Sequence, residues 1–449
     1  MNINKILIWS FLPASFALLL YLITFHFPIG KASPPGNHDF RVNTYHTSEE
    51  TWEKTYGGSE SDVAYAVRPV PGQNKFVATG VTQSLGHGYM SVLLFQFDAS
   101  GHLEWCKGLG SDVINGANDM LVTDQSRYLI VGLSQPDRSR GSASGDVYVT
   151  KVNRDGEIRW ERTYGGSARD GATSVIPADD GGYIVSGITQ SYGSGGKDVF
   201  VLCIDEQGKK NWQMTSGGER EDASFCSVNT GEGGYIIGGS RTVQPERREE
   251  GEYVYLMRVN TDGEKEWDQV YTLGPPSDYG GRPTSRANAV VKTAAGNFLI
   301  AGWTDRAEKK TGFFLKIDGK GNVIWKKKLD ASSKNKLIEL TKTKSGYVAC
   351  GKKLFTTGRG WDGYLLKVDS EGDIEWSHTH GQKSDGFFGN LESFHSILLS
   401  QENQLVVAGK NERLPETEQS DDAYVLKLTS GGRLRMDPDK STESSNGTK

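Results

Sequence analysis

The chain has 449 residues, of which 36% are hydrophobic and 24% charged, and it contains 56 Gly against 14 Pro. This is the composition of a folded protein with many tight turns, and it excludes a collagen-like or a disordered chain. The formal net charge is −5 and there is no block of basic residues, so we expect no nucleic acid among the partners.

The amino-terminal region is dominated by one apolar stretch. Residues 6–25, ILIWSFLPASFALLLYLITF, carry no charge, and about twenty such residues can cross a bilayer as a helix. Lys5 and the terminal amine favour a cytoplasmic position for residues 1–5. We therefore expect a signal-anchor helix followed by a tether at 26–51, with the rest of the chain outside the cytoplasm, periplasmic or on the cell surface. The alternative is a signal peptide cleaved near Ala32, which would give a secreted protein.

A phrase containing tryptophan recurs along the remainder of the chain, as in WEKTYGG (52–58) and WERTYGG (160–166). The marker tryptophans are Trp52, Trp105, Trp160, Trp212, Trp267, Trp325 and Trp376. Their spacing is 53, 55, 52, 55, 58 and 51 residues, a period that is typical of stacked repeat units.

Each unit contains four short β-prone runs separated by turn residues. In the third unit these are ATSVIPA, YIVSGIT, DVFVLCID and KNWQMTS, with DDGG and EQGK between them. Turns such as VNRDGEIRW are interpreted as tight hairpins rather than calcium loops, because they lack the closing Glu of an EF-hand. The pattern predicts an all-β fold: a seven-bladed β-propeller of four-stranded antiparallel blades.

Counting the strands predicts how the ring closes. The strand at Trp52 should pair with the last unit, around residues 393–428, so that the propeller spans 52–436. The segment GGRLRM, which ends at Met436, competes for that place but lacks the TYGG continuation, and residues 437–449 are expected to form a disordered tail.

A glycine also recurs inside every second strand. These glycines are Gly80, Gly132, Gly187, Gly239, Gly302, Gly351 and Gly409. Glycine weakens a strand unless another backbone approaches closely, and we interpret these positions as contacts between radially packed blades. The tryptophans are interpreted as apolar plates between adjacent blades, with a stacking platform for sugars or bases as the alternative.

The pattern W-x-x-x-Y-G-G, D-x-A, D-G-G-Y-I-V-x-G-x-T and D-x-Y-x-x-K-x-D-x-x-G resembles the SBBP-type seven-bladed β-propeller repeats of extracytoplasmic proteins. The resemblance extends from Trp52 to Met436 and implies a fold without implying an activity. A weaker similarity, to quinoprotein-type propellers, rests on VDSEGDIEW (368–376). The chain lacks the adjacent cysteine pair of the quinone-dependent enzymes, so no quinone cofactor is expected.

Two sets of carboxylates recur on the side of the disc where the longest loops are expected. One set follows the glycine pair and the other begins the third strand: Asp62, Asp170, Asp222 and Asp385, then Asp146, Asp198, Asp362 and Asp422. We interpret them as acceptors that fix loop backbone N–H groups. The sharper hypothesis is a divalent cation between neighbouring loops, with Asp62, Asp170 and Asp222 as ligands; otherwise no cofactor is expected.

Histidines and cysteines supply the remaining candidate ligands. His378 and His380 share one face of a strand, with His395 further on, and two imidazoles at this spacing can hold a metal, although a third ligand is not evident. Substitution at ordinary strand positions is the alternative. The four cysteines, Cys106, Cys203, Cys226 and Cys350, show no metal-binding spacing, so we expect structural packing, with a single disulfide as the alternative.

The long insertions fall on one side of the predicted disc, and they are residues 134–146, 240–253, 271–288 and 411–423. Variable loops on a rigid scaffold commonly carry binding, and no nucleophile elbow, phosphate loop or paired-carboxylate motif is evident. We therefore expect a non-catalytic, membrane-tethered scaffold that binds another envelope or surface protein. The alternatives are a carbohydrate-active hydrolase or lyase with acidic residues at the central channel, and a surface adhesive protein.

Overall fold

The computed structural model describes residues 40–86, 89–110, 114–123, 127–135, 145–243, 250–273, 283–306, 309–330, 334–354, 360–381, 391–413 and 420–435. The elements in these ranges are strands, numbered β1 to β29. The described part of the chain offers no helix with the length and apolarity needed to span a membrane. The apolar stretch 6–25 lies outside the described residues.

The strands follow one another as antiparallel groups of four. The first two groups are β3 (Asp62–Pro69), β4 (Lys75–Thr82), β5 (Ser91–Asp98) and β6 (Leu103–Leu109), then β7 (Ile114–Thr123), β8 (Arg127–Gln135), β9 (Asp146–Val152) and β10 (Ile158–Tyr164). The next two are β11 (Asp170–Pro177), β12 (Tyr183–Thr189), β13 (Asp198–Ile204) and β14 (Lys210–Ser216), then β15 (Asp222–Asn229), β16 (Tyr235–Val243), β17 (Gly251–Val259) and β18 (Lys265–Tyr271). Two more are β19 (Thr284–Lys292), β20 (Phe298–Arg306), β21 (Lys309–Ile317) and β22 (Val323–Lys328), then β23 (Asn335–Thr343), β24 (Gly346–Leu354), β25 (Trp361–Val368) and β26 (Ile374–His380).

The last sheet combines both ends of the propeller. It has five strands in the order β1 (Arg41–Thr47), β2 (Trp52–Gly57), β29 (Ser420–Leu428), β28 (Leu405–Arg413) and β27 (Leu391–Leu399). The antiparallel register of β2 on β29, from Trp52 opposite Lys427 to Tyr56 opposite Ala423, closes the ring. Strand β1 lies within the stretch expected to be a tether, where it adds an outer strand to β2.

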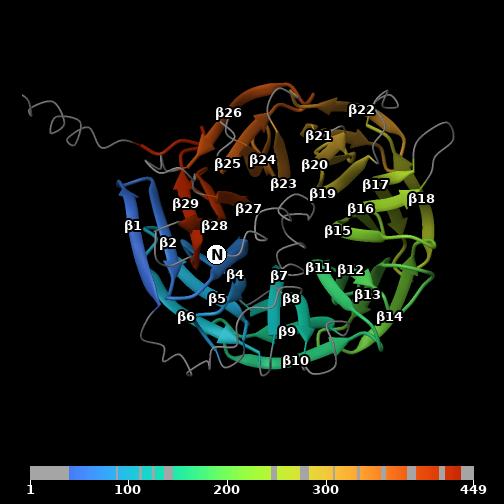
Figure 1. Ribbon diagram of the computed structural model, residues 1–449, viewed down its shortest axis with the longest axis horizontal. Coiled ribbons are helices and arrows are strands. Elements are labelled where there is room, and N and C mark those ends of the chain that lie inside the picture. The colour runs from blue at the N-terminus through green and yellow to red at the C-terminus, as the bar shows by residue number, and fades with distance from the viewer. Residues whose placement is uncertain are drawn as a thin grey trace, which may run out of the picture.

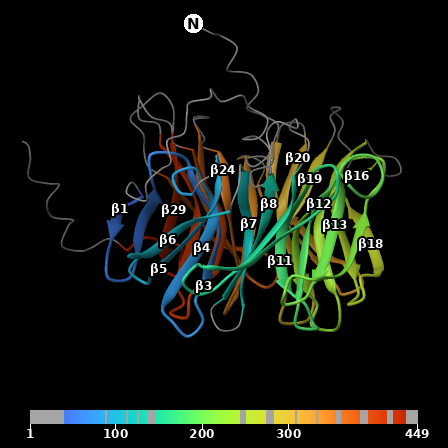
Figure 2. The ribbon, with the colours of Figure 1, turned by 90° about the horizontal axis from the view of Figure 1, so that it is seen from below.

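The groups stand around a common axis as the blades of a β-propeller (Figure 1). Figure 2 shows the strands running between two rims, with short hairpins such as the one between β3 and β4 on the lower rim. The first strand of each group lies nearest the axis and the fourth lies outermost. Buried apolar side chains fill the space between neighbouring groups, so that each hydrophobic cluster draws residues from two of them, as when Leu129 and Val149 pack with Val185 and Phe200.

The expected seven separate sheets are not what the hydrogen bonding produces. The described strands form six sheets, of which four have four strands, one has five and one has eight. The eight-stranded sheet holds β15 to β18 and β19 to β22, joined by the parallel pair Glu252 and Thr284. This fusion arises because the start of β17 meets the start of β19, where the Glu252 amide donates to the Pro283 carbonyl at 2.8 Å.

A β-bulge explains the glycine of every second strand. The first strand of each group shifts register at a bulge, and a second-strand glycine pairs with the residue just before the shift, as Gly187 pairs with Ala172. A Cβ at Gly187 would lie 2.0 Å from the Gly171 carbonyl oxygen. The close backbone therefore belongs to the paired strand of the same group, which corrects the expectation that a neighbouring blade approaches these glycines.

The recurring W-x-x-x-Y-G phrase connects each outer strand to the next group. The Trp52 ring lies against Gly101 in the hairpin after β5, so that a Cβ at Gly101 would come within 2.9 Å of the ring. The Trp52 indole N–H donates to the Ala99 carbonyl at 2.9 Å, and the Tyr56 hydroxyl donates to the Gly101 carbonyl at 2.8 Å. The tryptophan and tyrosine of the phrase thus hold the hairpin of the following group in place.

Candidate functional site at the central channel

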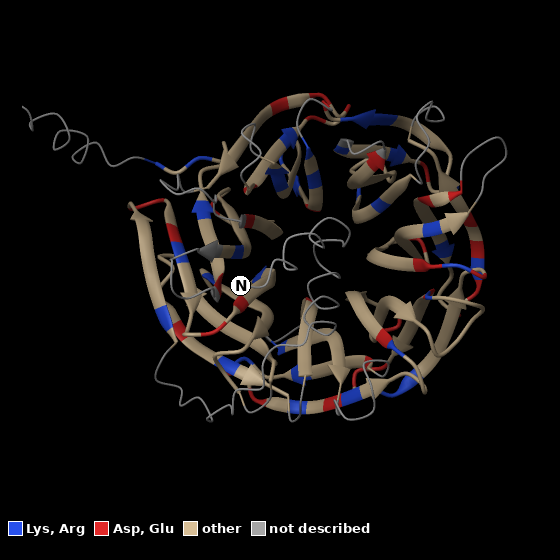
Figure 3. Ribbon diagram, in the orientation of Figure 1, with Lys and Arg blue, Asp and Glu red and all other residues tan. Residues whose placement is uncertain are grey.

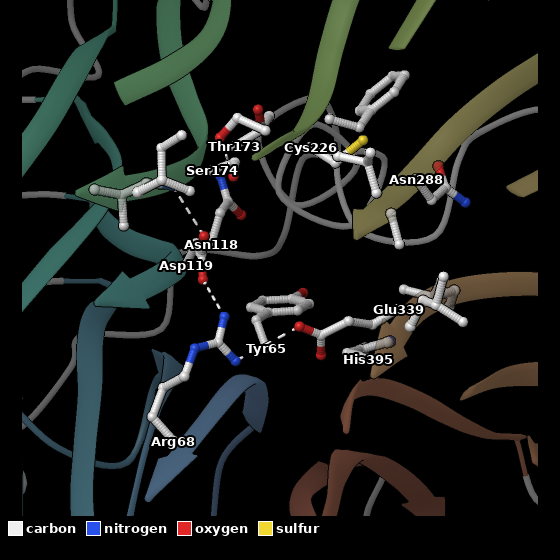
Figure 4. Close-up of a pocket in the computed structure, with 18 residues that line it drawn as sticks. Tyr65, Arg68, Asn118, Asp119, Thr173, Ser174, Cys226, Asn288, Glu339 and His395 are labelled. Atoms are coloured by element: carbon white, nitrogen blue, oxygen red, sulfur yellow. Dashed lines mark hydrogen bonds and ion pairs between the residues drawn. The ribbon is translucent and has the colours of Figure 1, made fainter. Parts of the chain in front are cut away.

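The bulged residues of the innermost strands line a cavity on the axis of the ring. They are Tyr65, Asn118, Thr173, Phe225, Asn288, Ile338 and His395. The cavity has a volume of about 200 Å³, and Figure 4 shows its labelled side chains converging from several strands. Because a bulge leaves its extra residue out of the ladder, each first strand presents one side chain to the channel.

Several of these side chains bind the backbone of the next group around the ring. Asn118 Nδ2 donates to the Ala172 carbonyl at 2.7 Å, and Asn288 Nδ2 donates to the Leu337 carbonyl at 2.7 Å. The Thr173 hydroxyl donates to the Ser224 carbonyl at 3.0 Å. The acceptor is in each case the residue that precedes the next bulge, so these polar side chains form a belt that connects neighbouring groups.

His395 occupies the corresponding position where the last group meets the first. Its Nδ1 lies 3.3 Å from the Ala64 carbonyl oxygen, its Nε2 lies 2.8 Å from the Ser393 hydroxyl, and its ring stacks on Tyr65 at 5.0 Å. Burial, together with Lys352 and Lys410, lowers the pKa of His395 to about 3. The imidazole is therefore neutral at physiological pH, with Nδ1 donating to Ala64.

A three-membered ionic cluster spans the cavity. Arg68 Nη2 lies 2.6 Å from Asp119 Oδ1, and Arg68 Nη1 lies 3.5 Å from Glu339 Oε1. The two carboxylates also accept backbone N–H groups from further strands: Val175 donates to Asp119 at 2.9 Å and Ile397 donates to Glu339 at 2.7 Å. The cluster thus ties together strands β3, β7, β11, β23 and β27. The dashed lines at Arg68 in Figure 4 mark its ion pairs with Asp119 and Glu339.

The charge balance of this cluster limits its chemistry. Burial raises the pKa of Glu339, and the nearby Arg68 guanidinium opposes that rise. Although burial alone would lower the pKa of Arg68, Asp119 and Glu339 raise it. The axis therefore carries an acid with a raised pKa, but that acid faces an arginine and already accepts a backbone hydrogen bond.

Polar atoms in the cavity remain available to a ligand. The Tyr65 hydroxyl and Asn118 Oδ1 are buried without a hydrogen-bond partner in the described residues. Buried polar atoms of this kind usually find a partner in water or in a bound molecule. The cavity can thus bind a small polar group beside aromatic and amide side chains.

The predicted cation ligands Asp62, Asp170 and Asp222 lie at junctions between neighbouring groups, away from one another. Each carboxylate accepts the backbone N–H of the second glycine in its phrase: Gly58 to Asp62 at 2.9 Å, Gly166 to Asp170 at 3.0 Å and Gly218 to Asp222 at 2.8 Å. Asp62 and Asp170 also accept serine hydroxyls, from Ser84 at 2.7 Å and Ser191 at 2.6 Å. These carboxylates fix the loops, which is the role that the sequence suggested first.

Carboxylates of the second recurring set come close to those of the first. A Cβ at Gly165 would lie 2.2 Å from Asp146 Oδ1 and 2.6 Å from Asp170 Oδ2, and Gly217 stands in the same relation to Asp198 and Asp222. The first glycine of the phrase is needed because these two carboxylates occupy the space of a side chain. The described residues contain no group of three His, Cys, Asp or Glu side chains that could hold a metal ion. Asp385 lies outside the described residues.

The histidine pair is remote from the channel. His378 and His380 lie on the outer strand β26, where His380 Nε2 is 2.9 Å from the Gly432 carbonyl and Arg433 Nε is 3.3 Å from His378 Nε2. Burial lowers the pKa of both imidazoles. They dock the carboxyl-terminal turn, and His395 lies on the innermost strand β27. All four cysteine thiols are free, three of them buried and Cys106 half-buried.

Arg68, Asp119 and Glu339 were not among the residues that the sequence analysis selected. A comparison of equivalent positions could have found them, because the position of Arg68 holds Leu121, Ile176, Val228, Val291, Thr341 and Leu398 in the other units. A cation at a position that is mainly apolar in the other units is the sequence signal that could have indicated this site. Residues 136–144, 244–249, 274–282 and 414–419 of the four long insertions lie outside the described residues, and of the described residues in these insertions only Asn288 lines the cavity.

Comparisons with known proteins identify the fold. No family model and no curated protein matches the chain. Among solved structures, the polysaccharide lyase Uly1 is similar with a TM-score of 0.50 and 11% identity over 84% of this chain and 91% of the lyase chain. The Pan2 WD40 domain of Neurospora crassa has a TM-score of 0.48 and 8% identity, covering 83% of this chain and 90% of that domain. Sqt1 from Chaetomium thermophilum has a TM-score of 0.46 and 10% identity over 87% of this chain and 100% of that chain. At 11% identity the similarity to the lyase concerns the fold alone and shows no particular activity.

Proposed function

We propose that the protein is an SBBP-type, seven-bladed propeller that serves as a non-catalytic binding scaffold outside the cytoplasm, anchored in a membrane by residues 6–25. Each antiparallel group of four strands counts as one blade, including the two groups that share the eight-stranded sheet. The observation that carries the proposal is the engagement of Asp119 and Glu339 by Arg68 and by backbone N–H groups. Carboxylates held in this way connect strands instead of standing free for acid–base work.

The proposed partner is another envelope or surface protein that binds the side of the disc bearing the long insertions. Three of these insertions lie between a second and a third strand and the fourth lies between β18 and β19. The recurring carboxylates Asp62, Asp170 and Asp222 brace the same rim. A rigid rim under variable loops is the usual arrangement of a propeller that binds proteins. The scaffold needs no cofactor. A divalent cation held by Asp146 and Asp170 would be an additional ligand.

A carbohydrate-active enzyme is the second candidate, and the cavity gives it one specific observation. Glu339 has a raised pKa, and it faces a cavity with amide, hydroxyl and aromatic side chains from Asn118, Thr173 and Tyr65. A carboxyl group of raised pKa near a polar cavity is a recognised feature of active sites. If the wild type turns over an acidic polysaccharide and the Glu339→Gln variant does not, that result would favour the enzyme.

Affinity capture tests the scaffold. The full-length chain, tagged at its carboxyl terminus, is purified from a detergent-solubilised envelope extract, and the retained proteins are identified and quantified by mass spectrometry. We expect one stoichiometric partner that is lost when residues 244–249 are replaced by a short turn. A variant with a rebuilt β3–β4 hairpin, residues 70–74 on the opposite rim, is the control and should keep the partner. Equal retention by both variants would contradict the assignment of the binding face.

A further inference from the structure

One buried lysine lacks the acceptors that the other buried lysines have. Among the described residues, Lys151, Lys336 and Lys427 are at most 5% exposed. Lys151 donates to the Tyr183 hydroxyl at 2.8 Å and pairs with Glu206, and Lys427 donates to the Ala99 carbonyl at 3.0 Å. The ammonium of Lys336 makes no hydrogen bond or ion pair to the described residues and lies 3.8 Å from the centroid of the Trp303 ring. An ammonium has three donors to satisfy, and leaving them unpaired inside a protein is costly.

The surroundings of Lys336 are predominantly cationic. Lys336 at the start of β23 is directly opposite Lys352 on β24, and like charges in that arrangement destabilise a sheet. Burial lowers the pKa of Lys336 well below its ordinary value, with Lys352, Lys310 and Arg286 adding to the effect and Asp305 opposing it. Figure 3 shows the Lys and Arg bands on β19, β21, β23 and β24 around the inner part of the ring.

Two of these cations pair with carboxylates. Arg286 Nε lies 2.7 Å from Glu252 Oε1, and Lys310 Nζ lies 3.7 Å from Asp305 Oδ2. Glu252 and Asp305 thus accompany Arg286 and Lys310. The side chains of Lys310 and Arg286 are 22% and 15% exposed, so that the border of Lys336 reaches solvent.

The repeat makes this cluster unusual. Arg286 and Lys336 occupy the same position in consecutive units, two residues before the bulged residue. The other units have Val63, Gly116, Gly171, Ala223 and Ser393 there. Trp303 lies between the two cations, with Lys336 Nζ at 3.8 Å and Arg286 Cζ at 5.6 Å from its ring centroid. The indole therefore holds both cations in place, as cation–π contacts do.

We propose that Lys336, bordered by Arg286, Lys310 and Lys352, binds a small oxyanion: a carboxylate, sulfate or phosphate group. Such a group supplies the acceptors that the Lys336 ammonium lacks and offsets the repulsion that Lys352, Lys310 and Arg286 exert on it. The site lies at the rim where second strands end and third strands begin, beside the mouth of the channel. It does not depend on the proposed scaffold, since a free anion is sufficient to occupy it.

Isothermal titration of the full-length protein in detergent tests the site, with sulfate, phosphate and glucuronate as separate probes at constant ionic strength. We expect at least one probe to bind, and Lys336→Met to weaken its binding at least tenfold. The preferred probe distinguishes an inorganic anion from a sugar carboxylate. Lys316→Met is the matched control, because Lys316 also lies over an indole, 5.7 Å from the Trp325 centroid, but donates to the Ser370 carbonyl at 3.1 Å. Its probe affinity should be unchanged.

Thermal unfolding separates anion binding from a structural role for this lysine. Without added anion, Lys336→Met should unfold at the same or a higher temperature than the wild type, because a buried charge and its repulsion are removed. Unfolding at a lower temperature would instead mark Lys336 as a structural residue and overturn the proposal. Equal probe affinity in the wild type and Lys336→Met, or no binding of any probe to the wild type, would also overturn it. If the variant does not fold, crystals of the wild type soaked in selenate decide, with an anomalous peak near Lys336 Nζ expected and its absence contradicting the site.

Discussion

Replacing Gly187 with alanine should disrupt the bulge that brings Thr173 into the channel. The new Cβ would lie 2.0 Å from the Gly171 carbonyl oxygen and 2.8 Å from the Ala172 Cα. Both are backbone atoms of the paired strand, so relief requires the bulge to open by about 1 Å. Overpacking of this kind typically costs 1 to 3 kcal/mol, and we expect about 3 kcal/mol because neither clashing atom belongs to a movable side chain. Equilibrium unfolding in urea, followed by tryptophan fluorescence, measures the loss.

Gly218→Ala is the matched control for this experiment. A Cβ at Gly218 would have no atom within 4 Å, so we expect the free energy of unfolding to be unchanged or slightly higher, because alanine restricts the unfolded chain. The comparison is made on urea midpoints with equal slopes, since a changed slope would signal an altered unfolding process. Equal midpoints for Gly187→Ala and Gly218→Ala would refute the reasoning that the bulge requires glycine.

Two further predictions concern charged groups. Arg68→Met should lower the free energy of unfolding by about 2 to 4 kcal/mol, because it leaves two half-buried carboxylates without their cation. A triple variant that combines Arg68→Met with Asp119→Asn and Glu339→Gln should recover part of this loss in the same urea assay. A triple variant no more stable than Arg68→Met would contradict the prediction. Burial raises the pKa of Asp62 from 3.8 to about 6, so its contribution to stability is full below pH 3.8 and is lost as the pH rises through 6. The free energy of unfolding of Asp62→Asn, relative to that of the wild type, should therefore increase by about 3 kcal/mol from pH 3.5 to pH 7. Urea unfolding at each pH measures this difference between the two proteins. A difference that does not change with pH would exclude Asp62 as the titrating group.

The sequence predicted the architecture well because the repeat encodes contacts between neighbouring units. The tryptophan and tyrosine of one phrase bind the hairpin of the next group, as Trp52 and Tyr56 bind the hairpin at Gly101. Such contacts must recur wherever the repeat recurs, so they are visible as a period. Strand β1 belongs to no repeat, and nothing in residues 41–47 marked it as an outer strand on β2.

The bulge was beyond prediction for a different reason. A glycine in a strand indicates a close backbone, but it does not say whether that backbone belongs to the same group or to a neighbouring one. The answer depends on the register of pairing, in which Gly187 stands opposite Ala172 immediately before the shift. The same shift determines which residue enters the channel, so the lining of the cavity could not be deduced without it.

The candidate sites lie at positions where the residue type differs from one repeat unit to another, and this follows from the way a ring of similar units is built. Positions needed for closure hold the same residue in each unit, and they leave little freedom for a ligand. Positions facing the axis and the rim are equivalent in space but differ in chemistry, so that one column contains Arg286 and Lys336 beside Val63 and Gly171. Burial of a cation in such a column costs free energy, and its presence there requires a compensating contact. Arg68 has that contact in Asp119 and Glu339, whereas Lys336 has no acceptor among the described residues, which is the physical reason to look for its anion.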